Sequence, residues 1–263
     1  MTAIKTVMVA GAGFMGAGIA QVSAGAGYKV LLWDIRTELV TQALAKMAAG
    51  LDSRVAKGKL TAAAKEDILG NITVAAQLED GGDADLVVEA VLEDLAVKKD
   101  VFARLDGACK PSAIFASNTS AIPISSIATA TKRAAQFAGA HFFSPVPVMK
   151  LVEIVKGLHT SAETCAAIGA YVASLGKVGV LVKDTPGFLV NRLMHAFRQE
   201  VFACLEEGVA GLEDIDTAVR LGLGHPMGPF ELNDFAGLDI GAATIATLYE
   251  NFKDVKWRPN LTL

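Results

Sequence analysis

The chain opens on a Gly-rich segment that has the spacing of a phosphate-binding loop. Gly11-Ala12-Gly13-Phe14-Met15-Gly16 follows an apolar run and begins a helical pattern. In a strand–turn–helix context the first glycine permits a tight turn, the second lets the backbone approach a pyrophosphate, and the third lets the helix pack on the strand. The N–H groups at the start of the helix then face the phosphate oxygens. We therefore predict that this segment binds a dinucleotide.

A carboxylate follows the next strand-like run at the distance that this reading requires. Asp34 lies 23 residues after Gly11, where an acidic side chain accepts hydrogen bonds from the adenosine ribose. The same carboxylate repels a 2′-phosphate, so the sequence favours NAD over NADP. Arg36, two residues on, keeps NADP open as an alternative. A Gly-rich turn followed by a surface Asp is the structural alternative to a cofactor site.

A histidine and a glutamate have the spacing of an acid–base pair. His141 ends an apolar run in Ala140-His141-Phe142-Phe143, and a histidine there suits proton transfer because it titrates near neutrality. Glu153 lies in the next strand-like run, after the turn over 144–148. If that run folds back beside the strand of His141, the carboxylate reaches the imidazole and fixes its tautomer. His141 and Glu153 are therefore candidate catalytic residues.

Further polar residues follow two other strand-like runs. Glu89, Glu93 and Lys98 come with one of them, and the run Ser117-Asn118-Thr119-Ser120 follows the next. In open parallel sheets, ligands bind beyond the carboxyl ends of the strands, so these side chains are candidates for the same site. Lys98 fits a solvated helix face equally well. Ser120 with His141 also permits hydrolysis, but the serine lacks the GxSxG turn of a hydrolase nucleophile.

Strand-like and helix-like segments alternate along the first two thirds of the chain. Such alternation predicts parallel strands with right-handed crossovers, and six strands in two βαβ halves predict a doubly wound, Rossmann-type α/β sheet. The expected strands are Ile4–Ala10, Lys29–Trp33, Ile72–Val74, Asp85–Ala90, Ile114–Ala116 and Phe137–Phe143, and the expected helices are Phe14–Gly25, Glu38–Lys57, Leu95–Leu105 and Ile124–Ala130. The stretch 38–70 is longer than one crossover helix needs, so we expect a helical hairpin capped by Thr61.

The pattern changes after residue 143. Two more strands are expected at Lys150–Val155 and Lys177–Val182, around a helix at Glu163–Leu175. From residue 184 the sequence is helical, with helices expected over Phe188–Glu207, Leu212–Leu221 and Gly228–Phe252. We therefore expect an NAD-binding domain at 1–183 and a small all-α domain at 184–263.

Composition limits the partners of the chain. A net charge of −4 and 52% apolar residues are ordinary for a globular protein and favour neither nucleic acid nor an anionic membrane, which attract basic surfaces. There is no run of about 18 apolar residues and no charged-then-apolar leader. Cys109, Cys165 and Cys204 form no disulfide framework, so a reducing cytoplasm is expected. His159 suits a solvated loop and His225 a turn, and no spacing suits a metal. His195 lies four residues after Asn191 on the same helix face, so a position at the cleft stays open, but a packed or surface histidine is favoured.

Taken together, these motifs resemble the bacterial short-chain 3-hydroxyacyl-CoA dehydrogenases. The matching stretches cover essentially the whole chain in the order of that family. They are GAGFMGAGIAQ at 11–21, EAVLEDLAVK at 89–98, SNTSAIPI at 117–124, HFFSPVPVMKLVEIV at 141–155, DTPGFLVNRL at 184–193 and GHPMGPFELNDFAGLD at 224–239. The resemblance implies an NAD-dependent oxidoreductase that acts on acyl-CoA substrates and forms a homodimer through its second domain.

The resemblance also implies roles for four residues at the reacting carbon. His141 is the base that takes the 3-hydroxyl proton, and Glu153 is its partner. Ser120 contacts the substrate and the cofactor. Asn191, on the first helix of the second domain, orients the substrate.

Other positions follow from the same comparison of motifs. Glu93 and Lys98 match positions that line the cofactor site, and Lys57 in the helical hairpin matches a position that touches coenzyme A. The family usually has HFFNP where this chain has Ser144, so we expect a weaker or water-mediated cofactor contact there. Relatives also continue into a Gly/Lys-rich tail, whereas this sequence stops at Leu263.

The expected reaction is the interconversion of a short-chain (S)-3-hydroxyacyl-CoA and its 3-keto form. Two other functions stay open from the sequence. One is a related dehydrogenase of a free hydroxy acid or sugar acid. The other is a non-enzymatic, crystallin-like nucleotide-binding protein, which the joint presence of Ser120, His141, Glu153 and Asn191 disfavours.

Overall fold

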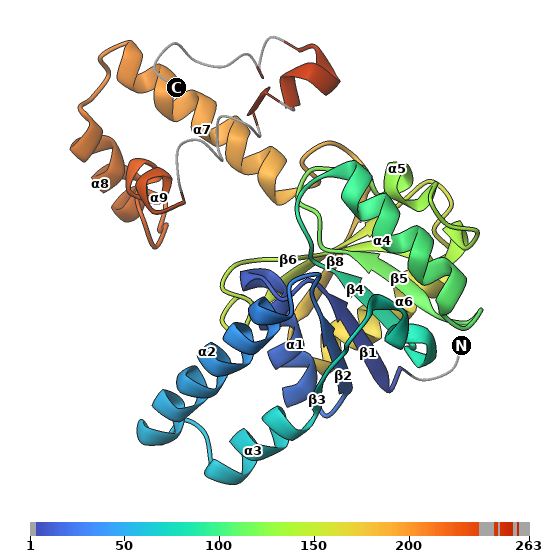
Figure 1. Ribbon diagram of the computed structural model, residues 1–263. Coiled ribbons are helices and arrows are strands. Elements are labelled where there is room, and N and C mark those ends of the chain that lie inside the picture. The colour runs from blue at the N-terminus through green and yellow to red at the C-terminus, as the bar shows by residue number, and fades with distance from the viewer. Residues whose placement is uncertain (1–3, 237–244, 247, 255–256, 258–263) are drawn as a thin grey trace. The chain divides into compact units, whose positions relative to one another are not determined.

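The computed structural model describes residues 4–236, 245–246, 248–254 and 257 (Figure 1). The chain divides into two compact units, Met1–Asp184 and Thr185–Leu263, which are described separately below. Part of the helix expected over 228–252 and the last residues of the chain, 258–263, lie outside the described residues.

The first unit is built on one eight-stranded sheet with the order β3-β2-β1-β4-β5-β6-β7-β8. Its strands are β1 Thr6–Ala10, β2 Lys29–Trp33, β3 Ile72–Val74, β4 Leu86–Glu89, β5 Ile114–Ser117, β6 Phe137–Phe142, β7 Leu151–Lys156 and β8 Val178–Lys183. The first six strands are parallel, and β7 runs antiparallel to β6. The strand order reverses at β1 and β4, which confirms the predicted doubly wound α/β sheet.

Helices cover both faces of this sheet (Figure 1). In the first unit they are α1 Phe14–Gly25, α2 Thr37–Ala56, α3 Ala62–Gly70, α4 Leu95–Ala108, α5 Ile124–Ala128 and α6 Ala162–Ser174, with 3₁₀ turns at Leu78–Asp83 and Ala134–Gln136. Alternate residues of each strand face opposite sides, so both faces must be apolar. Val7 and Val9 belong to a buried apolar cluster that also includes residues of α1 and α6. On the other face, Phe102 of α4 stacks against Phe115 and Phe137.

The helices α2 and α3 lie side by side as a hairpin (Figure 1). Thr61 caps α3, because its Oγ1 accepts a hydrogen bond from the N–H of Ala64 at 3.1 Å. An ion pair between Lys65 Nζ and Asp52 Oδ1, 2.7 Å apart, joins the two helices. The inner face of α2 packs on the core of the sheet through buried residues such as Met47.

The second unit contains α7 Val190–Glu206, α8 Leu212–Gly222 and α9 Pro229–Ala236 among its described residues. A small apolar core joins them, with Phe202 of α7 edge-on to Phe230 of α9. The first helix starts two residues later than its expected start at Phe188. Phe188 has a φ of 48°, a left-handed conformation that cannot begin a right-handed helix.

Two features are absent from the described part of the chain. None of its helices is long and apolar enough to cross a bilayer. No group of His, Cys, Asp or Glu side chains there is arranged to hold a metal ion.

All three cysteines carry free thiols, and burial raises the pKa of the Cys109 thiol to about 11.

Candidate active site

The Gly-rich loop leaves β1 at the carboxyl edge of the sheet. Gly11 has a φ of 110°, and a side chain there would collide with the backbone carbonyl of Ala90. A Cβ at Gly13 would meet no atom within 4 Å, so the backbone at this position is open to a ligand. Gly13 also starts α1 without a side-chain cap, which leaves the first N–H groups of the helix to bind an anion. The loop therefore fits the pyrophosphate of a dinucleotide.

Asp34 lies directly after β2 and is bound to this loop. Its Oδ2 accepts a hydrogen bond from the N–H of Ala12 at 2.8 Å, and its Oδ1 accepts one from the N–H of Arg36 at 3.1 Å. A carboxylate offers about four acceptor positions, so roughly two remain for the hydroxyls of a ribose. The half-buried side chain thus holds the loop in shape and also fits the adenosine half of NAD.

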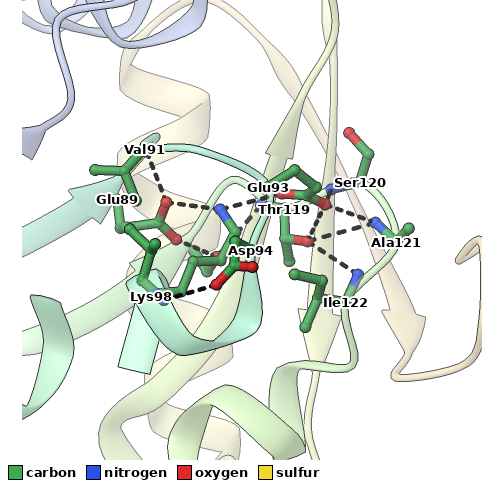
Figure 2. Close-up of polar contacts among 11 residues, drawn as sticks. Glu89, Val91, Glu93, Asp94, Lys98, Thr119, Ser120, Ala121 and Ile122 are labelled. Atoms are coloured by element: carbon green, nitrogen blue, oxygen red, sulfur yellow. Dashed lines mark hydrogen bonds and ion pairs between the residues drawn. The ribbon is translucent and has the colours of Figure 1, made fainter. Parts of the chain in front are cut away.

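Two carboxylates and one ammonium form a connected network at the ends of β4 and β5 (Figure 2). Glu89 Oε1 accepts hydrogen bonds from Lys98 Nζ and from the N–H of Val91, both at 2.7 Å. Its Oε2 accepts one from the hydroxyl of Ser117 at 2.6 Å. Lys98 Nζ also lies 3.1 Å from Glu93 Oε2. The side chains of Glu89 and Lys98 are almost completely buried, so they form an interior ion pair. Further hydrogen bonds to the same carboxylate and ammonium offset part of the cost of burying the charges.

Glu93 extends this network to the loop that follows β5 (Figure 2). Its Oε1 accepts hydrogen bonds from the hydroxyl of Thr119, from the N–H of Ser120 at 2.9 Å and from the N–H of Ala121 at 3.2 Å. Burial opposes its negative charge. The Lys98 ammonium and the hydrogen bonds from Thr119 and Ser120 outweigh that cost and hold the pKa of Glu93 below its ordinary value. One carboxylate therefore fixes the backbone that carries Ser120.

His141 and Glu153 face each other across two antiparallel strands. The register of β6 and β7 pairs the two residues directly, so their side chains leave the same face of the sheet. His141 Nδ1 lies 2.7 Å from Glu153 Oε2, and both side chains are buried. This bond orients the imidazole. Such an arrangement serves general acid–base catalysis.

The remaining residues that the sequence predicted for the site differ in how exposed they are and in which contacts they make. Ser120 and Ser144 are exposed, at the ends of β5 and β6. Lys57 is exposed at the end of α2, about 30 Å along the helix from Thr37 at 1.5 Å per residue. Lys98 is buried, with its ammonium between Glu89 and Glu93. The structure thus brings Glu93, Lys98 and Ser120 into one network and His141 and Glu153 into a pair.

A groove of about 490 Å³ lies against the Gly-rich loop. It is lined by Gly13 and Phe14 of that loop, by one side of α2 around Lys46, and by Pro145 and Pro147 just after β6. Its volume lies within the range of sites for small ligands, roughly 300–1,000 Å³. The Gly-rich loop and the segment after His141 therefore line one groove.

Three polar residues have structural roles here that the sequence analysis did not assign. Asn118 accepts a hydrogen bond from the backbone of Phe142, Glu89 binds Lys98, and Asp184 accepts hydrogen bonds from the first turn of α5. The sequence could have pointed to two of them, because Glu89 and Asn118 lie at the carboxyl ends of neighbouring strands, where polar side chains are candidates for a site. Asp184 gave no such signal, since its partners lie about 60 residues away.

Replacing Glu153 by glutamine tests its role beside His141. The amide keeps an oxygen that can accept from Nδ1, but it no longer stabilises the positive charge that the ring gains with a proton. We expect turnover to fall by roughly 10–100-fold and the pH profile of the rate to change. Steady-state rates across pH measure both effects. A profile superimposable on that of the unmodified enzyme would remove the partner role.

Asn191 and His195 lie in α7 of the second unit. Asn191 is half-buried in the first turn, and His195 is almost fully buried, with no hydrogen-bond partner for its Nδ1 among the residues that the structure describes. Burial, together with the nearby positive charge of Arg198, lowers the pKa of His195 to about 4. The second unit therefore holds this histidine in its neutral form.

The buried His195 makes the free energy of unfolding sensitive to acid. An unfolded histidine takes up its proton near pH 6.5, before the folded one, so the stabilisation is complete above that pH and is lost as pH falls toward 4. For this reason we expect the free energy of unfolding to be about 2–3 kcal/mol lower at pH 4.5 than at pH 7. The variant His195→Leu should lose less of its free energy of unfolding over the same pH range than the unmodified protein. Urea titrations at both pH values measure it, with exposed His159→Leu as the control. Parallel losses in both variants would contradict the assignment.

Comparison with known proteins gives a consistent result over the whole chain. Residues 6–185 match the family model for the NAD binding domain of 3-hydroxyacyl-CoA dehydrogenase, and residues 187–263 match the model for its C-terminal domain. A probable 3-hydroxybutyryl-CoA dehydrogenase of Bacillus subtilis is 43% identical over 97% of this chain and 89% of its own length. The 3-hydroxyadipyl-CoA dehydrogenase of Escherichia coli is 44% identical over 99% of this chain and 55% of its own.

The fold agrees with solved structures of similar proteins. The crystal structure of (S)-3-hydroxybutyryl-CoA dehydrogenase from Ralstonia eutropha superposes with a TM-score of 0.96 at 43% identity, covering 99% of this chain and 92% of that one. The chain therefore belongs to the 3-hydroxyacyl-CoA dehydrogenase family, and it is an NAD-dependent dehydrogenase whose cofactor is NAD.

Proposed function

We propose that this enzyme interconverts (S)-3-hydroxybutyryl-CoA and acetoacetyl-CoA, with His141 as the general acid and base. The observation that carries the proposal is the buried His141–Glu153 pair, 2.7 Å apart, at the same edge of the sheet as the Gly-rich loop. Relatives that act on 3-hydroxybutyryl-CoA, by their names, are about 43% identical to this chain over most of its length. A proton-transfer group and a dinucleotide loop at one edge are what an alcohol dehydrogenation needs.

The chemistry divides between the cofactor and the protein. Bound NAD supplies the acceptor for the hydride that leaves C3, and NADH supplies the hydride in the reverse direction. His141 removes the proton of the 3-hydroxyl during oxidation and returns it to the ketone oxygen during reduction. Glu153 stabilises the ring while it carries that proton. The O–H and C–H bonds of the alcohol are thereby exchanged for one C=O bond, with the proton on His141.

The other site residues are proposed to bind and orient the ligands. Gly11, Ala12, Gly13, Phe14, Met15 and Gly16 hold the pyrophosphate, and Asp34 holds the ribose. Glu93 and Lys98 fix the loop that carries Ser120, which contacts the substrate and the nicotinamide half of the cofactor. Ser144 makes a further cofactor contact, and Asn191 orients the substrate from the second unit.

The acyl-CoA is proposed to reach this edge through the groove beside α2. The groove is apolar along most of its lining and has Lys46 as a cation on its wall. Lys57, at the end of the same helix, is exposed and in position to pair with a phosphate of coenzyme A. The hairpin of α2 and α3 would then hold the coenzyme A end of the substrate.

Residues 1–183 are proposed as the NAD-binding domain and 184–263 as the domain for substrate contacts and dimerisation. The second unit leaves large apolar side chains exposed, with Leu221 at 82% and Phe235 at 79% of their full accessibility. Such a surface suits a homodimer. Sedimentation as a monomer at micromolar concentration would contradict this. The three free thiols suit a reducing compartment, and we propose the cytoplasm.

The function is tested by following the absorbance of NADH with acetoacetyl-CoA as substrate. We expect NADH to be consumed with acetoacetyl-CoA, much less with free acetoacetate, and NADPH to replace NADH poorly because Asp34 repels its 2′-phosphate. Equal rates with acetoacetate would indicate a dehydrogenase of free hydroxy acids. Binding of NADH without any turnover would indicate a non-enzymatic nucleotide-binding protein.

A further inference from the structure

The side-chain amide of Asn118 has one half committed to the fold and the other half available. Asn118 directly follows β5, and its Oδ1 accepts a hydrogen bond from the backbone N–H of Phe142 at 2.8 Å. The backbone N–H of Asn118 donates to the backbone carbonyl of Glu89, also at 2.8 Å. Only the oxygen of an amide can accept from an N–H, so the bond to Phe142 fixes which way the amide is turned. Nδ2, with its two N–H donors, faces the other way.

No group in the described part of the chain accepts a hydrogen bond from Asn118 Nδ2. The side chain is largely buried, with 9% of the residue accessible, and Nδ2 is not sealed from solvent. Buried amide donors in folded proteins are nearly always satisfied, because leaving one unmade costs free energy. A partly buried donor with solvent access at the carboxyl edge of a doubly wound sheet suits a ligand.

The position of this donor is fixed by the same network that fixes the loop. The N–H of Thr119 donates to the hydroxyl of Ser117 at 3.3 Å, and that hydroxyl donates to Glu89 at 2.6 Å. On the other side, the bond to Phe142 places the amide next to the backbone of the residue that follows His141. Asn118 is therefore held still between the ends of β5 and β6 before any ligand arrives, as a preorganised binding group must be.

We infer that Asn118 is a ligand-binding residue whose Nδ2 donates a hydrogen bond to a carbonyl oxygen of a ligand bound beside His141. This inference rests on the proposed function, which supplies two ligands with such an oxygen. One is the carboxamide oxygen of the nicotinamide, and the other is the C1 carbonyl oxygen of the acyl-CoA. Both are uncharged acceptors, and both must come close to His141 for the reaction to occur.

Asn118→Asp separates the two halves of this amide. The variant keeps an oxygen for the N–H of Phe142 and replaces the donor by an acceptor, which repels a carbonyl oxygen. We expect the melting temperature to change little and the affinity for one ligand to fall about 10–100-fold. The readouts are the dissociation constant of NADH from fluorescence titration without substrate, and the KM values for NADH and acetoacetyl-CoA. A rise confined to NADH assigns the nicotinamide, and a rise confined to acetoacetyl-CoA assigns the acyl group.

Gln136→Glu is the matched control, because it makes the same exchange of NH₂ for an oxygen at a half-buried position just before the start of β6, away from this edge. It should leave both affinities within about twofold of the unmodified enzyme. If Asn118→Asp also leaves the NADH dissociation constant and both KM values unchanged, the inference is overturned. If the unmodified enzyme binds NADH but does not reduce acetoacetyl-CoA, the proposed function fails instead, and the NADH titration still tests Asn118.

A second measurement on the unmodified enzyme covers the case in which Asn118→Asp does not fold. The ligands are then changed instead of the protein. NADH is compared with its thiocarboxamide analogue, in which sulfur replaces the carbonyl oxygen, and acetoacetyl-CoA with a thioether analogue that lacks the C1 carbonyl. We expect one of the two analogues to bind about tenfold or more weakly, because a weak acceptor or none faces Nδ2. Equal binding within both pairs would overturn the inference.

Discussion

His141→Ala is expected to lower turnover of acetoacetyl-CoA by about 10²–10⁴-fold, the range that a positioned acid–base group contributes. The reason is that no other group then takes or gives the proton at the 3-oxygen. The Gly-rich loop and Asp34 do not contact His141 through any of the bonds described above, so NADH should bind with nearly unchanged affinity. Single-turnover rates and a fluorescence titration of NADH measure the two quantities.

Glu153 requires a companion variant, because His141→Ala leaves its buried carboxylate without the bond to Nδ1. His141→Asn places an amide N–H near the position of Nδ1 and removes the proton-transfer group. Both variants should be equally inactive, with the Asn variant the more stable of the two. His159→Ala, at an exposed loop position, is the control and should be fully active. Retained turnover in His141→Asn would exclude His141 as the acid and base.

Lys98→Met is expected to have the largest effect on stability. Removing one partner of a buried ion pair leaves a carboxylate uncompensated in the interior, which typically costs about 3–5 kcal/mol. Here Glu89 loses its bond at 2.7 Å and Glu93 its neighbour at 3.1 Å. The loop bound to Glu93 should loosen as well, so the KM values should rise in the molecules that remain folded. Denaturant unfolding and steady-state kinetics at 25 °C measure these effects.

Two further variants make the result specific to the buried pair. Lys65→Met removes a similar 2.7 Å bond to the exposed Asp52 and should cost far less stability, because solvent-exposed ion pairs contribute little. In the double variant Lys98→Met with Glu89→Gln, the uncompensated charge of the buried Glu89 is gone, and only the partly exposed Glu93 keeps its charge. Its loss should therefore be smaller than the sum of the two single losses. A cost for Lys98→Met no greater than that for Lys65→Met would show that the network contributes little.

The parts of the fold and site that depend on neighbouring residues were predictable from the sequence. The Gly-rich loop is formed by residues that are adjacent in the sequence, so the spacing of its glycines alone predicts the strand–turn–helix. The strands alternate with helices at the lengths that a doubly wound sheet requires. The pairing of His141 with Glu153 depended on one condition, that the second strand fold back on the first, and the register of β6 and β7 meets it.

Contacts between distant elements were not predictable in the same way. Lys98 stands in a helix whose sequence equally suits a solvated face, and only the packing of α4 against β4 buries its ammonium between two carboxylates. The orientation of the Asn118 amide depends on Phe142, 24 residues later. The start of α7 depends on the left-handed conformation of Phe188, which the helical pattern of the sequence did not reveal.

The bonds of Asp184 decide where the chain can be cut to study the first unit alone. Its two carboxylate oxygens accept from the N–H groups of Ile124 and Ser125 and from the hydroxyl of Ser125, at 2.6–2.9 Å. The helix that they begin, α5, has only five residues and is far too short to persist without tertiary support. A protein truncated before Asp184 leaves these donors without their acceptor, in the segment that continues the Ser120 loop. A protein that ends after Asp184 keeps them, so the extent of a truncated NAD-binding domain is decided by a single side chain.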